Sequence, residues 1–145
     1  MAGSRTPARR LAVQALYQWQ LAGQDSADII AQFCEEQAPN AAQREYFSDL
    51  LRGVLTRLDE LDDLLAPLLE RPLAQVDPVE RAVLRVGAFE LAHRPEVPYR
   101  VVINEAVELA KRFGAEQGHR FVNSVLDRLA RDLRAVERKA PGNAS

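Results

Sequence analysis

DPVERAVLRVGAFELAH, residues 77–93, carries the clearest helix signal in the chain. Asp77 suits the N-cap, Pro78 suits the first helical position and Glu80 suits the third, which together form a strong start signal. The segment that follows is apolar on most of its circumference, through Val79, Ala82, Val83, Leu84, Val86, Ala88, Phe89, Leu91 and Ala92. A helix that is hydrophobic nearly all round is buried, so we expect this helix at the centre of the molecule.

Helical periodicity extends outward from this segment in both directions. Upstream, the spacing predicts helices over residues 7–22, with Thr6 as the cap, 26–37 and 41–58. The apolar pattern continues to residue 69, with a break near Asp59 and a kink at Pro67. Downstream, it predicts helices over residues 101–113 and 119–136, the second with Val136 still in its apolar stripe. Since no strand-like alternation occurs, the sequence predicts an all-α fold of six or seven helices.

Length and composition restrict the class of protein. The 145 residues, 47% hydrophobic and 28% charged, are typical of one globular domain rather than a disordered chain. The single cysteine, Cys34, excludes a disulfide framework. No run approaches the 18 apolar residues of a membrane span, so we expect a soluble, cytoplasmic protein. We expect one domain over residues 1–145, with a flexible basic arm at about 1–6 and a frayed tail at about 139–145.

Catalytic signals are missing from the sequence. His93 and His119 lie far apart, and neither has metal-ligand spacing with a cysteine, an aspartate or another histidine. No glycine-rich loop links a strand to a helix, so a phosphate-binding nucleotide site is not expected. We therefore expect no catalytic residue, no metal and no cofactor, and we do not expect an enzyme.

Charge is divided unevenly along the chain, although the net charge is only −2. Residues 1–24 contain three arginines and no acid, whereas residues 25–99 contain seven basic and fifteen acidic residues, for −8. Residues 100–145 contain nine basic and six acidic residues, for +3. This distribution suits a local anion-binding face and a separate acidic face. Chance clustering of solvated charge is the alternative interpretation.

The predicted helix over residues 7–22 has an unusual second face. Arg10, Gln14, Tyr17 and Leu21 form a stripe opposite its apolar side. Arginine and glutamine hydrogen-bond phosphates and base edges, and tyrosine stacks on unpaired bases. Arg5 and Arg9 flank the stripe and could follow a phosphate backbone as part of the arm. The alternative is that another helix covers Tyr17 and Leu21.

The start of the last predicted helix is a second candidate for anion binding. His119, Arg120, Phe121 and Asn123 gather where free backbone N–H groups and the positive end of the helix dipole favour anions. Phe121 lies at the flank of the apolar stripe, so it is either a core-edge residue or a stacking platform. Further along, Arg120, Arg131, Arg134 and Arg138 predict a basic face, which is often simply solvated.

Five stretches of the chain together resemble the NusB family of bacterial transcription antitermination proteins. They are RLAVQALYQWQL (10–21), YFSDLLRGV (46–54), VERAVLRVGAFEL (79–91), VPYRVVINEAVELAKRFGAE (97–116) and HRFVNSVLD (119–127). The resemblance covers nearly the whole chain in the family's order, and its specific motifs are INEAVELAKRFG in the fourth stretch and FVN-VLD in the fifth.

The resemblance implies a fold and a function. The fold is about seven helices in two packed three-helix bundles. The function is binding of boxA RNA in ribosomal-operon leaders together with the ribosomal protein NusE. The complex then acts on the RNA polymerase elongation complex, with other Nus factors, so that terminators are read through. No cofactor is implied.

The resemblance also assigns residues. The family's basic amino-terminal arm corresponds here to Arg5, Arg9 and Arg10. These are fewer basic residues than family members usually carry in the arm. Glu80 lies in the face that resembles the NusE-binding surface, and Arg85 lies one turn further along. Neutral Gln117 stands where relatives often have an acid, which should repel phosphate less. The candidate RNA-binding residues are Arg5, Arg9, Arg10, Gln14, Tyr17, Arg85, His119, Arg120, Phe121 and Asn123.

Two other classes of protein stay open at this point. The same fold forms an accessory domain of some ribosomal RNA methyltransferases, but this chain has no nucleotide-binding βα unit, so it would be a stand-alone relative. Alternatively, a helical protein-interaction module could use the acidic middle of the chain to bind a basic partner. RNA binding with a boxA-type and a scrambled RNA separates these classes.

Overall fold

The computed structural model describes residues 5–36 and 40–139, and within these ranges it contains helices and no strand. The all-α prediction is therefore confirmed. The α-helices are α1 (Thr6–Ala22), α2 (Ser26–Glu36), α3 (Ala41–Thr56), α4 (Leu58–Leu65), α5 (Pro78–His93), α6 (Tyr99–Phe113), α7 (Gly118–Leu133) and α8 (Ala135–Lys139). Two short 3₁₀ helices, η2 (Ala66–Leu68) and η3 (Leu73–Gln75), lie between α4 and α5.

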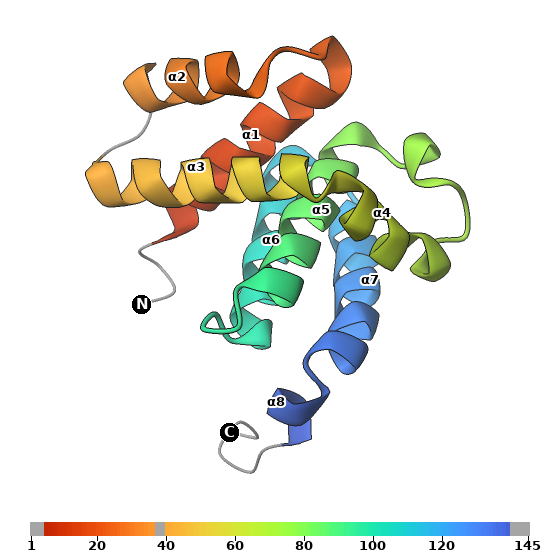
Figure 1. Cartoon of the computed structure of the whole chain (residues 1–145). Helices are drawn as coiled ribbons and strands as arrows, with labels where there is room; N and C mark the ends of the chain where they lie inside the picture. Colours follow the sequence, from red (N-terminus) through yellow and green to blue (C-terminus); the bar gives the residue numbers. More distant parts are fainter. Residues whose placement is uncertain (1–4, 37–39, 140–145) are drawn as a thin grey trace.

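Helix α5 is the central element, as its sequence predicts. It packs against α1, α3, α4, α6 and α7 (Figure 1). All ten residues from Ala82 to Leu91 are buried. Asp77 caps its start by accepting hydrogen bonds from the backbone N–H groups of Val79, at 3.1 Å, and Glu80, at 3.2 Å. The capped, apolar segment thus gives every other long helix except α2 a surface on which to bury its own apolar face.

The remaining helices pack around α5 in two neighbourhoods. α1, α2 and α3 contact one another, and α1 and α3 also contact α5. α6 and α7 contact each other and α5, and α4 contacts both α5 and α7. α5 belongs to both neighbourhoods, so a division of the chain into two three-helix bundles stays a prediction.

Most predicted helix boundaries agree with the structure. α3 ends at Thr56, α4 follows as a separate helix, and the 3₁₀ turn η2 contains Pro67, so the expected break and kink are present. The last helix differs from the prediction, because α7 ends at Leu133 and α8 starts afresh. Val136 is 87% exposed, so its predicted place in the apolar stripe is wrong.

The predicted arm and tail lie mainly outside the described residues, at 1–4 and 140–145. Thr6 is already the first residue of α1, and its hydroxyl donates to Glu105 at 2.5 Å. Residue 6 therefore belongs to α1 and not to the predicted flexible arm. At the other end, Lys139 is the last residue of α8 rather than part of a frayed segment.

α3 and α5 approach closely at one point. A Cβ placed on Gly53 would lie 2.3 Å from two ring carbons of Phe89. Phe89 is fully buried, so displacing its ring would disturb the packing of the core. Glycine at position 53 therefore sets the distance between these two helices.

Replacing Gly53 with alanine tests this contact, because two effects have opposite signs. Helix propensity alone predicts a gain of about 1 kcal/mol. Overpacking against Phe89 predicts a loss of roughly 1–3 kcal/mol, and we expect the loss to dominate. Urea unfolding of Gly53→Ala measures the sign. A G53A/F89L double variant should lose less than the two single losses combined, and a stabilised Gly53→Ala would contradict the close contact.

Candidate nucleic-acid interface

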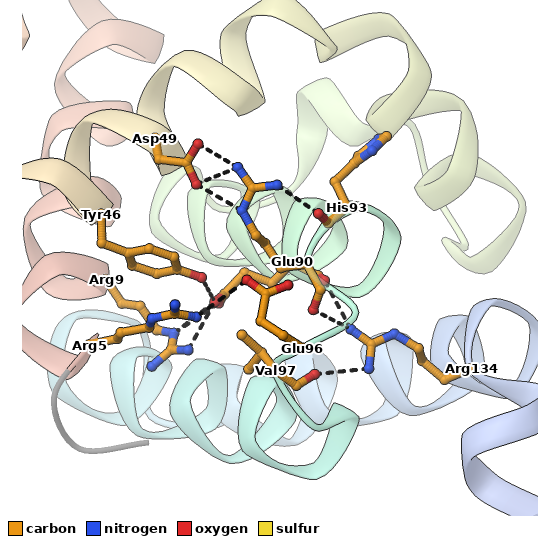
Figure 2. Close-up of polar contacts among 10 residues, drawn as sticks. Arg5, Arg9, Tyr46, Asp49, Glu90, His93, Glu96, Val97 and Arg134 are labelled. Carbon is orange, nitrogen blue, oxygen red and sulfur yellow. Dashed lines mark hydrogen bonds and ion pairs between the residues drawn. The ribbon is translucent and has the colours of Figure 1, made fainter. Parts of the chain in front are cut away.

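A buried ion pair fixes the inner face of α1. Arg9 is 1% exposed and Glu90 of α5 is equally buried. Arg9 Nε and Nη2 donate to the two oxygens of Glu90, each at 2.9 Å, and Nη1 donates to Glu105 of α6 at 3.1 Å. The hydroxyl of Tyr46 donates to the same Glu90 carboxylate (Figure 2). Side chains from α1, α3, α5 and α6 therefore meet in one polar cluster.

Electrostatics keep this cluster in one protonation state. Burial lowers the pKa of Arg9, but the hydrogen bonds and charge of Glu90 outweigh burial and hold that pKa above its ordinary value. Burial, followed by the charge of Glu90, raises the pKa of Tyr46 well above its usual range. At neutral pH the guanidinium is thus charged and the phenol is protonated, so both donate to Glu90.

This cluster corrects the role predicted for Arg9. We expected Arg9 to follow a phosphate backbone, but its guanidinium is enclosed and bound to two carboxylates. Arg5 is different. Its guanidinium lies over the Tyr46 ring, 4.2 Å from the centroid, and 3.7 Å from Glu96, while its side chain stays 35% exposed. Arg5 therefore remains a candidate for phosphate binding, and Arg9 does not.

The outward stripe of α1 is exposed, as predicted. Tyr17 is 38% exposed and Leu21 is 60% exposed, so none of the described helices covers them. Arg10 and Gln14 are half-buried in the same stripe. The alternative interpretation, in which another helix packs over Tyr17 and Leu21, is therefore wrong for the described residues.

Arg10 also lies beside α6, which sequence reasoning did not reveal. A hollow of about 500 Å³ brings it together with Lys111 and Arg112 near the end of α6. The Nε atom of Arg10 is buried and has no hydrogen-bond partner in the described part of the chain. Three cations thus line this hollow together with Glu105 and Glu108, and Lys111 is 3.4 Å from Glu108.

The start of α7 presents the second predicted group. Arg120 and Asn123 are exposed, and His119 is half-buried. Phe121 is partly buried and packs against the hydrophobic core. Phe121 therefore lies at the edge of the core with part of its ring still accessible, and its role as a stacking platform stays a prediction. Both exposed side chains remain candidates for nucleic-acid contact.

The two groups lie toward the same end of the molecule. The Gln20 side chain near the end of α1 donates to the carbonyl of Pro78 at 2.8 Å. Glu80, one turn into α5, lies against Gly118 at the start of α7, where a Cβ would be 2.2 Å from the Glu80 carboxylate. The end of α1 and the starts of α5 and α7 are therefore linked by direct contacts.

Glu80 and Arg85 are more enclosed than we expected. Glu80 is 6% exposed, and burial, with the charge of Asp77, raises its pKa against the opposing effect of Arg71. Its carboxylate is thus covered by the start of α7 rather than presented to a partner. Arg85 donates from Nε and Nη2 to Asp62 of α4, at 3.0 and 2.9 Å.

The third nitrogen of Arg85, Nη1, donates to Gln20 of α1 at 2.9 Å. The Arg85 guanidinium therefore joins α1, α4 and α5, and its predicted role in RNA binding is wrong in this structure, because its donors already have partners. Arg9 and Arg85 are the buried residues among the ten candidates, and the other eight are half-buried or exposed: Arg5, Arg10, Gln14, Tyr17, His119, Arg120, Phe121 and Asn123.

Arg134 was predicted to lie on a basic face of the last helix, but its side chain is buried. It is 6% exposed and donates to four backbone carbonyls where α5 ends, those of Glu90, Leu91, Arg94 and Val97. The carbonyls at a helix end lack partners within the helix, so Arg134 supplies donors for them (Figure 2). Its turn inward also separates α7 from α8.

Within residues 5–36 and 40–139, every helix is too short or too polar to span a membrane. Within the same ranges, no group of three or more histidine, cysteine, aspartate or glutamate side chains is placed to hold a metal ion.

Comparison with known proteins agrees with this geometry. Residues 6–131 match the model of the NusB family. Transcription antitermination protein NusB of Nitrosococcus oceani is 56% identical over 137 residues, covering 94% of this chain and 92% of that protein. The solved structure of T. maritima NusB is 32% identical with a TM-score of 0.80, covering 88% of this chain and 91% of that one.

A crystal structure of the antitermination factors NusB and NusE in complex with double-stranded RNA is also similar. It shares 28% identity and a TM-score of 0.82, covering 89% of this chain and 97% of that one. The chain is thus a small helical protein that is similar, over most of its length, to transcription antitermination proteins. The chain belongs to the NusB family.

Arg9 and Arg10 are adjacent arginines with opposite environments, which gives a matched pair of variants. Arg9→Ala leaves the buried Glu90 carboxylate without its main partner, so we expect a loss of about 3–5 kcal/mol in the free energy of unfolding. Arg10→Ala should change it by no more than about 0.5 kcal/mol. Urea unfolding of both variants makes the comparison, and equal small effects would show that the pair does not hold α1.

Proposed function

We propose that this chain is a transcription antitermination factor that binds boxA-type RNA together with the ribosomal protein NusE. Membership of the NusB family supports the antitermination role. The similar structure that contains NusB, NusE and RNA supports RNA and NusE as partners. The observation that carries RNA binding is the exposed α1 stripe, in which Tyr17 stands beside Arg10 and Gln14.

The chemistry of this stripe fits an RNA with unpaired bases. A tyrosine ring stacks on a base only when that base is free of a duplex. Arg10, with Lys111 and Arg112 beside it, supplies positive charge for the phosphates, and the amide of Gln14 can hydrogen-bond a base edge. Arg120 and Asn123 at the start of α7 extend this chemistry to a second helix.

The proposed assembly has two parts. The chain carries a net charge of −2, so it attracts RNA only weakly at long range and gains from a basic partner. Its acidic middle suits NusE, and Glu80 acts there as a positioning residue that holds the start of α7 against α5. In the cytoplasm, the complex would act on the RNA polymerase elongation complex with other Nus factors and let it pass terminators. The role is binding, without catalysis or a cofactor.

Tyr17 and Arg10 should affect RNA binding in different ways. Tyr17→Ala removes a stacking surface and should cost roughly 1–3 kcal/mol of binding free energy, whereas Tyr17→Phe keeps the ring and should bind normally. Arg10→Ala should weaken boxA-type and scrambled RNA by similar factors and lower the salt dependence by about 0.7 for one phosphate contact. Filter binding at several salt concentrations measures both. Unchanged affinity of a folded Tyr17→Ala variant would assign Tyr17 to another role.

Partner binding and RNA binding should be coupled. If NusE tightens RNA binding by some factor, RNA must tighten NusE binding by the same factor. We expect the affinity of this chain for boxA-type RNA to rise when NusE is present. Titrating RNA with and without NusE, and NusE with and without RNA, measures both sides of the cycle. Identical RNA affinity in the two titrations would leave this chain as a solitary RNA binder or a protein-docking module.

A further inference from the structure

A polar hollow of about 770 Å³ lies along one side of α3, next to the contact between Gly53 and Phe89. We call it the α3 hollow. Its charged lining residues are Arg44, Glu45, Asp49, Arg52, Arg57 and Arg94. Arg44, Arg52 and Arg57 are exposed, and none of them forms an ion pair within the described part of the chain.

The α3 hollow carries an excess of positive charge. Arg94 Nε donates to Asp49 at 2.8 Å, and its Nη2 contacts the same carboxylate, so Asp49 is neutralised (Figure 2). Glu45 is then the one acid that faces the three exposed arginines. An anion entering the hollow therefore meets more cations than carboxylates, in a protein whose net charge is negative.

The arginines form a row rather than a single cluster. Arg44 and Arg52 lie eight residues apart on α3, which separates them by about 12 Å along the helix axis at a rise of about 1.5 Å per residue. Arg57 follows directly after the last residue of α3. Guanidinium groups spaced in this way are too far apart to hold one small anion together, but they suit the successive phosphates of a nucleic-acid strand.

The α3 hollow is continuous with the place where α1 begins. A second hollow of about 650 Å³ shares Glu45, Asp49 and Arg94 with it and extends to Arg5, Tyr46 and Glu96. Arg5 precedes the first turn of α1 and remains partly exposed over the Tyr46 ring. An RNA strand that passes from the α1 stripe to Arg5 would thus reach the α3 hollow directly. This continuity favours RNA over an acidic protein segment as the occupant.

We propose that the α3 hollow is a second RNA-binding surface, which binds the phosphate backbone of nucleotides that flank the boxA-type segment. The inference rests on the proposed RNA-binding function and extends the RNA path from α1 to α3. Because arginine contacts to phosphate are independent of the base, this surface adds affinity for longer RNA without adding sequence preference.

The experiment compares RNAs of different length on the full chain. One RNA contains the boxA-type segment alone, and two others extend it at the 5′ or the 3′ end with unstructured uridines. We expect one extended RNA to bind wild-type protein more tightly than the short RNA does. The R44A/R52A double variant should lose that gain, keep wild-type affinity for the short RNA, and lower the salt dependence for the extended RNA by about 1.4 for two contacts.

The R128A/R131A double variant is the matched control, because it removes the same charge from exposed positions on α7 and should keep the gain. Thermal melts verify that all variants are folded. No gain from either extension, or a gain that R44A/R52A retains, would overturn the proposal. Loss of NusE binding with the gain intact would assign the hollow to protein instead. A wild-type chain that binds neither short nor extended RNA would refute the proposed function itself.

Discussion

The buried carboxylate of Glu90 is the group on which the rest of the structure depends. Its side chain accepts hydrogen bonds from Arg9 and Tyr46, and its backbone carbonyl accepts one from Arg134. A charge buried this deeply is tolerable only when its hydrogen-bonding capacity is filled, since desolvation otherwise costs several kcal/mol. α1 and α3 must therefore lie where the side chains of Arg9 and Tyr46 reach this one carboxylate of α5.

The same requirement explains how α1 can present a binding surface. Its inner face is held by the ion pair and by small buried residues that include Ala8, Ala12 and Ala15. Its outer face is then left in a fixed orientation, with Tyr17 and Leu21 exposed. A stacking residue on a rigid helix loses little conformational freedom on binding, which favours recognition. Structure and proposed function thus use opposite sides of one helix.

Sequence reasoning succeeded where the signal is local. The cap at Asp77, the apolar surround of α5 and the exposed stripe of α1 depend on residues within a few turns of one another, and the structure agrees with each. Arginines were the main failures, because the environment of a cation depends on distant carboxylates and carbonyls. Arg9 and Arg10 are identical neighbours in sequence, yet only the contact between Arg9 and Glu90, 81 residues away, separates their roles.

The long separation between Arg9 and Glu90 has a consequence for synthesis on the ribosome. The chain emerges from its amino end, and domains generally fold as units during translation. α1 and α3 are complete long before the carboxylate that neutralises Arg9 has been made, so neither helix has its final polar partner at that stage. Arg134 is made later still, 44 residues after the carbonyl of Glu90 that it binds. The polar contacts of α1 and α3 with Glu90 can therefore form only after α5 has been made, and the contact with Arg134 becomes possible last.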